Sequence, residues 1–506
     1  MKMRKFLTVI CFIVLAQPSA FAQLANDVDL DTLIPGSSGE PTTAVYPTGF
    51  PARGGDVDWG LALSGGGLRS AAFSIGVLKA LHQQKLLDHI DVISSVSGGG
   101  YASYWMYSKY DGDPATRFGD GAFDDSVFSK NVCDLARKSE FLPLRRMIGG
   151  LFSSDDSAFR KYREAIEYTF GANDNKTRDE KRNVGEEPLL PFTAFNQKIS
   201  ATGAPYFILN TTIAKDHTKG KTKYNIERSF EIGPTYRGNS VFGFAEWAGD
   251  PAVKTWCGGV ALSAAAIRFK LARKMPNESD GLKDAPKEIT MYDGGFSENL
   301  AALPLIQRRM KNIIIVDAEN DAAYKFPSYQ ALKKYLWDAH KITLGVEKID
   351  GFLSNTKRGK TFKDAAVAKG FVKYQDGAES TVYYIKMSRP DTIFGSKGKG
   401  LDVEGKPLPE PKRSKTRPTV CDNGFPTVTR ESLRTGMLSY SQFINETWTW
   451  RYLFKALPYI NYNFPELATV DQTYYRDQLE AFIGLGYLET LEMKAYAPLL
   501  SSNEAH

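Results

Sequence analysis

Residues 59–69 have the sequence WGLALSGGGLR, in which a short apolar run, Trp59–Leu63, leads directly into three glycines. The apolar residues between 71 and 81 then follow at mostly helical spacing. Residues 89–100, HIDVISSVSGGG, repeat this arrangement ahead of a second helix expected at 101–110. Because parallel strands need a helical crossover between them, two such units predict an α/β fold with a central, mostly parallel sheet.

The N-terminus has the three parts of a secretory signal peptide. Residues 1–5 carry three basic side chains, residues 6–16 are apolar apart from Thr8, and Ala20-Phe21-Ala22 resembles a cleavage site. This apolar run is much shorter than the roughly 20 residues that a membrane-spanning helix requires. We therefore expect residues 1–22 to be removed and the protein to be exported, periplasmic or secreted, and either soluble or peripheral to a membrane.

The composition is that of an ordinary globular protein, with 42% hydrophobic and 24% charged residues. It excludes a collagen-like, disordered or disulfide-scaffold chain. The formal charge of +6 falls to +3 without the three basic residues of the signal peptide, and such a mild excess does not indicate a nucleic-acid partner. The three remaining cysteines permit at most one internal disulfide, and none belongs to a C-x-x-C zinc pair.

Three further segments are expected after the signal peptide. Residues 23–57 are rich in Pro, Gly, Thr and Asp and predict an irregular entry. Residues 58–390 hold the α/β pattern, with an insertion at about 111–200 that contains a helix over 157–170. Residues 391–506 form a basic linker and an aromatic-rich, mainly helical C-terminal region. The oligomeric state is not indicated.

Ser97 occupies a turn that resembles a nucleophile elbow, Ser95-x-Ser97-x-Gly99. In such a strand-to-helix turn the serine Oγ projects into the site, and small neighbours let the strand and the helix approach closely. Ser95 stands where glycine is commoner, whereas Gly99 fits the pattern. An ordinary Gly/Ser turn is the alternative interpretation.

Gly65, Gly66 and Gly67 expose backbone N–H groups at the start of a helix, where they can hold an anion. No Lys-Ser/Thr pair follows them, as a Walker A loop requires, and Ser70 replaces the third glycine of a dinucleotide fingerprint. An oxyanion hole fits better, because it needs only two or three N–H donors. Arg69 could support this loop electrostatically, or it could be a surface helix residue.

Asp293-Gly294-Gly295 follows a strand expected at 289–292 and precedes a helix expected at 299–310. An aspartate that ends a strand can reach a neighbouring strand end and take the proton of Ser97. The alternative is an ordinary Asp-Gly turn. A Ser-Asp-His triad in this order would need His340 or His506, and neither is in a loop suited to that role. A Ser-Asp dyad is therefore the simpler interpretation.

Together these three turns resemble the patatin-like phospholipase family, which is related to cytosolic phospholipase A2. The resemblance covers roughly residues 58–317 and includes the strand at 205–213 and the small-residue segment 262–266. It implies a three-layer α/β fold. It also implies that Ser97 is the nucleophile and Asp293 its base. The resemblance assigns two further groups of residues. The oxyanion hole would consist of Gly65, Gly66, Gly67 and Arg69. The residues that support the turn around the nucleophile would be Ser95, Gly98 and Gly99.

This resemblance implies a serine lipid acyl hydrolase, and the predicted signal peptide adds that the enzyme is exported. It would cleave acyl esters of phospholipids or lysophospholipids at a lipid or membrane surface, with no cofactor or metal and no nucleic-acid or nucleotide partner. Two alternatives stay open. One is a general carboxylesterase or lipase that acts on soluble esters, and the other is a non-catalytic lipid-binding envelope protein.

Overall fold

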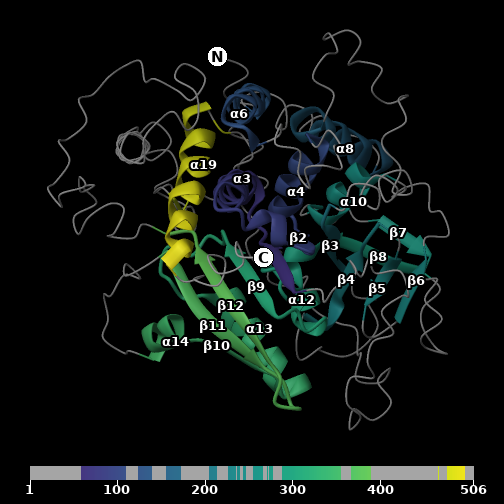
Figure 1. The fold of residues 1–506 in the computed structure, drawn as a ribbon. Coiled ribbons are helices and arrows are strands. Elements are labelled where there is room, and N and C mark those ends of the chain that lie inside the picture. The colour runs from purple at the N-terminus through teal and green to yellow at the C-terminus, as the bar shows by residue number, and fades with distance from the viewer. Residues whose placement is uncertain are drawn as a thin grey trace, which may run out of the picture.

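Figure 1 shows the fold of the chain in a computed structural model. The predicted signal peptide, the irregular entry segment and the basic linker lie outside the residues that it describes. The described residues are 58–109, 123–139, 155–171, 204–213, 226–234, 236–239, 243–246, 255–265, 271, 273–276, 288–354, 366–388, 465, 466, 474 and 476–495.

The strands of the described residues form one 12-stranded sheet in the order β10-β11-β12-β9-β1-β2-β3-β4-β5-β6, with β8 paired to β3 and β7 paired to β8. The five central strands, β12, β9, β1, β2 and β3, run parallel to one another. The pairings outside them are antiparallel. The predicted central, mostly parallel sheet is confirmed. The strands are β1 (Trp59–Leu63), β2 (Val92–Val96), β3 (Tyr206–Ile213), β4 (Ser229–Ile232), β5 (Tyr236–Asn239), β6 (Gly243–Glu246), β7 (Arg273–Pro276), β8 (Glu288–Asp293), β9 (Asn312–Asp317), β10 (Thr343–Val346), β11 (Val367–Lys373) and β12 (Glu379–Lys386).

Helices cover both faces of the sheet and complete the expected three layers (Figure 1). Within the described ranges, none of them combines the length and the apolar character needed to cross a bilayer. One face carries α3 (Gly67–Gln83), α4 (Gly98–Ser108), α6 (Asp125–Ser139), α8 (Asp155–Phe170), α10 (Trp256–Ser263) and α19 (Arg476–Leu491), and the other carries α12 (Leu303–Gln307), α13 (Pro327–His340) and α14 (Glu347–Ser354).

The central strands are apolar on both sides because each side faces a helical layer. In β1, Leu61 and Leu63 belong to the core beneath α3, whereas Ala62 belongs to the core beneath α12 and α13. In β9, Ile314 likewise faces the first core and Ile315 the second. Alternation of side chains along a strand therefore divides the interior into two cores, one for each layer of helices.

The prediction of a helix at 299–310 is wrong in its extent. The helix there, α12, covers only Leu303–Gln307. The Glu298 carboxylate accepts the backbone N–H groups of Leu300, Ala302 and Leu303 at 2.7, 2.8 and 3.2 Å. Ala301 has a φ of 57°, which is incompatible with a right-handed helix. Glu298 thus holds the chain in a turn before the helix can begin.

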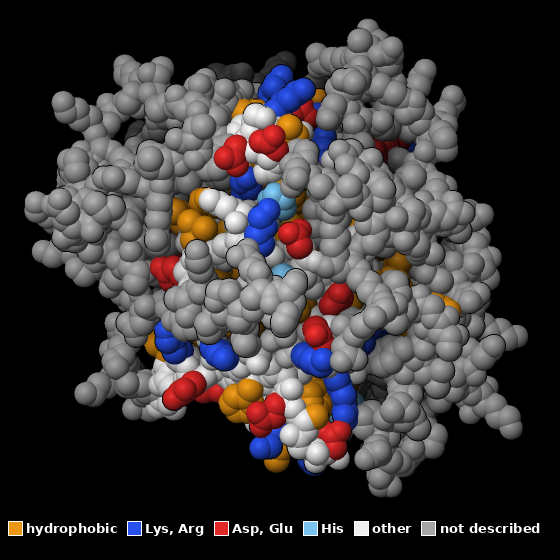
Figure 2. Space-filling model, in the orientation of Figure 1, with side chains coloured by type: hydrophobic (Ala, Val, Ile, Leu, Met, Phe, Trp, Pro, Cys, Tyr) orange, Lys and Arg blue, Asp and Glu red, His pale blue; other side chains and the backbone are white. Residues whose placement is uncertain are grey.

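Helices from the predicted insertion and from the C-terminal region belong to the same core as the sheet. The helix expected at 157–170 is present as α8, which packs with α4 and α10. The C-terminal helix α19 lies along α3, and most of its described side chains are buried. On the face drawn in Figure 2, described acidic and basic side chains lie interspersed at the surface.

Two cysteines lie within the described residues. Cys133 on α6 is disulfide-bonded, whereas Cys257 on α10 is a free thiol that is buried in the core. Burial raises the pKa of the Cys257 thiol well above its usual value, so it stays protonated at neutral pH.

Candidate active site

The turn at Ser97 joins β2 to α4 at the carboxyl end of the central strands. Ser97 is the residue that precedes the first turn of α4, and it has φ 51° and ψ −116°, a conformation that a residue other than glycine rarely adopts. Glycine is required at the next two positions because other backbone lies against them. A Cβ at Gly98 would come within 2.1 Å of the Gly67 carbonyl oxygen, and one at Gly99 within 2.2 Å of the Leu63 oxygen.

Ser95, the departure from the usual elbow pattern, is accommodated inside the sheet. Its side chain is fully buried, and its Oγ lies 3.2 Å from the Ser103 Oγ and 3.4 Å from the carbonyl oxygen of Ile208. The hydroxyl therefore finds hydrogen-bonding partners between strand and helix, in a place where glycine would leave only space.

The glycine loop lies directly beside the elbow, at the start of α3. The N–H of Gly65 already donates to the carbonyl of Asn299 at 2.9 Å, so it is not available to a ligand. The N–H groups of Gly66, Gly67 and Gly98 have no acceptor among the described residues. Two helix N-termini, each with a positive end of its dipole, therefore present free N–H groups next to Ser97.

Arg69 lies behind this loop. It is fully buried, and its Nε and Nη2 donate to the carbonyl oxygen of Ala318 at 3.2 and 3.0 Å. The Ala318 N–H donates in turn to the Ser64 Oγ at 2.8 Å, just before the glycines. The guanidinium thus ties the glycine loop to the end of β9.

Asp293 ends β8 and contacts the serine side chain. Its Oδ2 accepts a hydrogen bond from the Ser97 Oγ at 3.0 Å, and its Oδ1 accepts one from the Gly295 N–H at 2.8 Å. Both side chains are almost fully buried, with 7% of Ser97 and 5% of Asp293 exposed. Hydroxyl and carboxylate are therefore within proton-transfer distance in a region of low dielectric.

β3 brings Ser97 and Asp293 together, because β2 and β8 pair with consecutive parts of the same edge of β3. Val96, the last residue of β2, lies opposite Asn210, and Asp293 lies opposite Thr211. β4 pairs with the other edge of β3. Since β2 is parallel to β3 and β8 antiparallel, the two strands meet end to end, and Ser97 follows the point where they meet.

No described histidine contacts the serine. His340, one of the two that a triad in this chain order would need, lies on α13 in the opposite layer of helices. Its Nε2 is 3.2 Å from the hydroxyl of Tyr335. His506 lies outside the described residues.

Two buried tyrosines, Tyr101 and Tyr162, lie near Asp293. The Tyr101 and Tyr162 hydroxyls are hydrogen-bonded to each other, and Tyr162 also donates to the carbonyl of Ala264 at 2.8 Å. Burial raises the pKa of both phenols, and the charge of Asp293 adds to the effect. They therefore stay neutral and supply hydrogen bonds rather than charge.

Asn299 is a site residue that the sequence motifs did not single out. Its carbonyl fixes Gly65, and its side-chain oxygen packs against both glycine turns. A Cβ added at Gly65 would be 2.2 Å from that oxygen, and one added at Gly295 would be 2.8 Å from it. Its position six residues after Asp293 was the one sequence feature that could have indicated a role in the site, but a single asparagine belongs to no specific motif.

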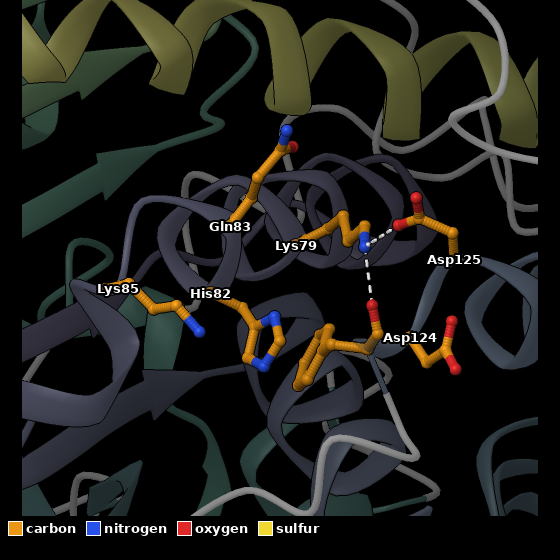
Figure 3. A pocket seen from close by; sticks show the side chains of 7 residues that line it. Lys79, His82, Gln83, Lys85, Asp124 and Asp125 are labelled. Carbon is orange, nitrogen blue, oxygen red and sulfur yellow. Dashed lines mark hydrogen bonds and ion pairs between the residues drawn. The ribbon is translucent and has the colours of Figure 1, made fainter.

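A separate hollow of about 360 Å³ lies near the C-terminal end of α3, and Figure 3 shows the side chains that line it. Lys79 lies 12 residues after Gly67, which is about 18 Å along a helix. Its Nζ donates to the Phe123 carbonyl and to the Asp125 carboxylate, at 2.5 and 2.6 Å. This hollow is thus remote from Ser97, and its most buried cation is already paired.

The class of the domain follows from comparison with known families. Residues 61–306 match the family model described as patatin-like phospholipase. This match covers just under half of the chain and agrees with the resemblance that the three glycine turns predicted. A comparison with curated proteins finds no match.

One solved structure shows the same fold. Human GIVD cytosolic phospholipase A2 superposes with a TM-score of 0.53 at 11% identity, over 88% of this chain and 62% of that one. This chain thus spans less than two thirds of that protein's length. VipD from Legionella pneumophila has 13% identity and a TM-score of 0.25, over 62% of this chain and 58% of VipD. The first likeness establishes a shared fold.

Proposed function

We propose that this protein is a serine lipid acyl hydrolase that cleaves acyl esters of phospholipids or lysophospholipids. The observation that carries the proposal is the 3.0 Å hydrogen bond between the Ser97 Oγ and the Asp293 Oδ2, inside a domain that matches the patatin-like phospholipases. A nucleophile, a base and free N–H donors side by side are the groups that acyl transfer requires.

In the proposed mechanism, Asp293 takes the proton of the Ser97 hydroxyl while Oγ attacks the ester carbonyl carbon. The oxygen of the tetrahedral intermediate becomes negatively charged and accepts hydrogen bonds from Gly66, Gly67 and Gly98. Asp293 then gives the proton to the departing alcohol, and the acyl group stays on Ser97. A water molecule, deprotonated by Asp293, attacks the carbonyl carbon of this acyl-enzyme. Asp293 then returns the proton to the Ser97 Oγ as the bond between Oγ and the acyl group breaks, and the fatty acid leaves.

Phospholipid vesicles and short-chain esters test the function, with the mature protein and two variants. Ser97→Ala should remove the covalent route, and Asp293→Asn should lower the rate by about 10²- to 10⁴-fold, because an amide cannot accept the proton. Turnover that persists in Ser97→Ala would overturn the mechanism. Release of fatty acid from short esters but not from phospholipid would instead assign a carboxylesterase that acts on soluble esters.

We also propose that the protein is exported after removal of residues 1–22, on the basis of the N-terminal sequence pattern. The full chain, produced in a bacterial host and fractionated, should leave the cytoplasm and begin at Gln23 by N-terminal sequencing. Cytoplasmic protein that still begins at Met1 would contradict export without affecting the proposed chemistry.

A further inference from the structure

Ser263, at the end of α10, makes a contact with the backbone of the elbow serine. Its side chain is fully buried. The Ser263 Oγ accepts the backbone N–H of Ser97 at 3.0 Å and donates its own proton to the carbonyl of Asn210 at 2.6 Å. A residue 166 positions further along the chain thus fixes the backbone of Ser97.

This contact acts on a backbone that would not keep its conformation unaided. Ser97 has φ 51° and ψ −116°, and such sparsely populated conformations persist only where the surroundings hold them. The direction of the N–H sets the direction of the Cα–Cβ bond. The Ser263 hydroxyl therefore helps to aim the Ser97 Oγ at Asp293.

The hydroxyl is itself held in place from two sides. The Asn210 carbonyl accepts the hydrogen bond that the Ser263 hydroxyl donates, and the Asn210 Nδ2 donates to the carbonyl of Ser95 at 3.0 Å. One residue of β3 therefore supports both ends of the elbow. On the other side, the Tyr162 hydroxyl donates to the carbonyl of Ala264, the next residue after Ser263. The Oγ of Ser263 therefore has a fixed position as acceptor.

We propose that Ser263 is a positioning residue for the nucleophile: its hydroxyl holds the elbow in the conformation from which Ser97 attacks. The proposal rests on the hydrolase function proposed above. It predicts a defect in the chemical step rather than in substrate binding, because Ser263 is buried beneath the elbow and acts only through Ser97.

Ser263→Ala tests the proposal through kcat, KM and the rate at which a fluorophosphonate labels Ser97. The variant should lower kcat and the labelling rate about 10- to 100-fold, with KM within about twofold of the wild type. Ser263→Thr keeps the hydroxyl and should retain at least about a third of kcat. Unchanged kcat in Ser263→Ala, or equal losses in the Ala and Thr variants, would overturn the proposal.

Ser139→Ala is the matched control. Ser139 is also fully buried, and its hydroxyl donates to the carbonyl of Ala136, far along the chain from the elbow. It should lower the melting temperature without lowering kcat of the folded enzyme. If Ser263→Ala lost kcat only as much as this control, its role would be structural. A wild type that neither hydrolyses esters nor reacts with fluorophosphonate would instead refute the proposed function.

Discussion

Arg69 illustrates how a side chain can serve a site without pointing into it. The family resemblance assigns it to the oxyanion hole, together with the glycines. In the structure its guanidinium lies behind the loop, where two N–H groups share the Ala318 carbonyl. We infer that Arg69 acts on the oxyanion indirectly, because it holds the glycine loop against the end of β9.

Arg69→Lys should therefore lower kcat about tenfold, since one ammonium cannot reproduce the two-pronged contact and a buried charge would be poorly satisfied. Steady-state kinetics on a soluble ester measure the effect. Arg309→Lys is the control, because Arg309 is 53% exposed in its ion pair with Asp376 and should leave kcat within about twofold. A kcat equal to the wild type in Arg69→Lys would contradict this role.

At the scale of elements, the contact between α3 and α19 depends on two glycines. A Cβ at Gly76 on α3 would be 1.9 Å from the Ile483 carbonyl oxygen, and one at Gly486 on α19 would be 2.0 Å from the Phe73 oxygen. The two backbones therefore touch where the helices cross. This approach explains two glycines that helix propensity alone would disfavour.

Gly486→Ala should destabilise the fold by about 1–3 kcal/mol or more, because the helices must move apart to admit one methyl group. Denaturant unfolding measures the change. Gly351→Ala on α14 is the matched control, since a Cβ there meets nothing within 4 Å. It should be neutral or stabilising by up to about 1 kcal/mol, because alanine is the better helix former. Equal effects of the two substitutions would argue against the close crossing.

The elements that the sequence predicted well are those encoded by neighbouring residues. The apolar runs before Ser64 and Ser97 and the strand before Asp293 each form as expected, because local alternation and glycine turns define them. The antiparallel direction of β8, the hydrogen bond from Ser97 to Ser263 and the docking of α19 were not predicted. Each depends on residues about 80 or more positions apart, and no local pattern encodes such a pairing.

At the scale of the whole molecule, buried carboxyl groups give the stability a dependence on pH. Burial raises the pKa of Glu298 from 4.5 to about 7, and burial together with Asp317 raises that of Glu319 to about 7. Between pH 4.5 and about 7, the folded state binds protons that the unfolded state releases. The protonated carboxyl groups therefore stabilise the fold fully below about pH 4.5, and this stabilisation is lost as the pH rises towards 7.

Glu298→Gln isolates this effect, because an amide resembles the protonated acid and does not titrate. Between pH 4.5 and pH 8, the wild type should lose about 3 kcal/mol of unfolding free energy relative to the variant. Denaturant unfolding of both proteins across this range gives the difference. Parallel pH profiles would show that Glu298 titrates normally.

The contact between α3 and α19 also determines when folding can finish. α3 begins at residue 67, among the first parts of the described core to be synthesised, whereas α19 ends at residue 491. Until the ribosome has made almost the whole chain, the face of α3 that receives α19 stays open to water. The nascent chain therefore cannot complete its core early. For the export that we propose, this delay favours a chain that is still unfolded when it reaches the membrane.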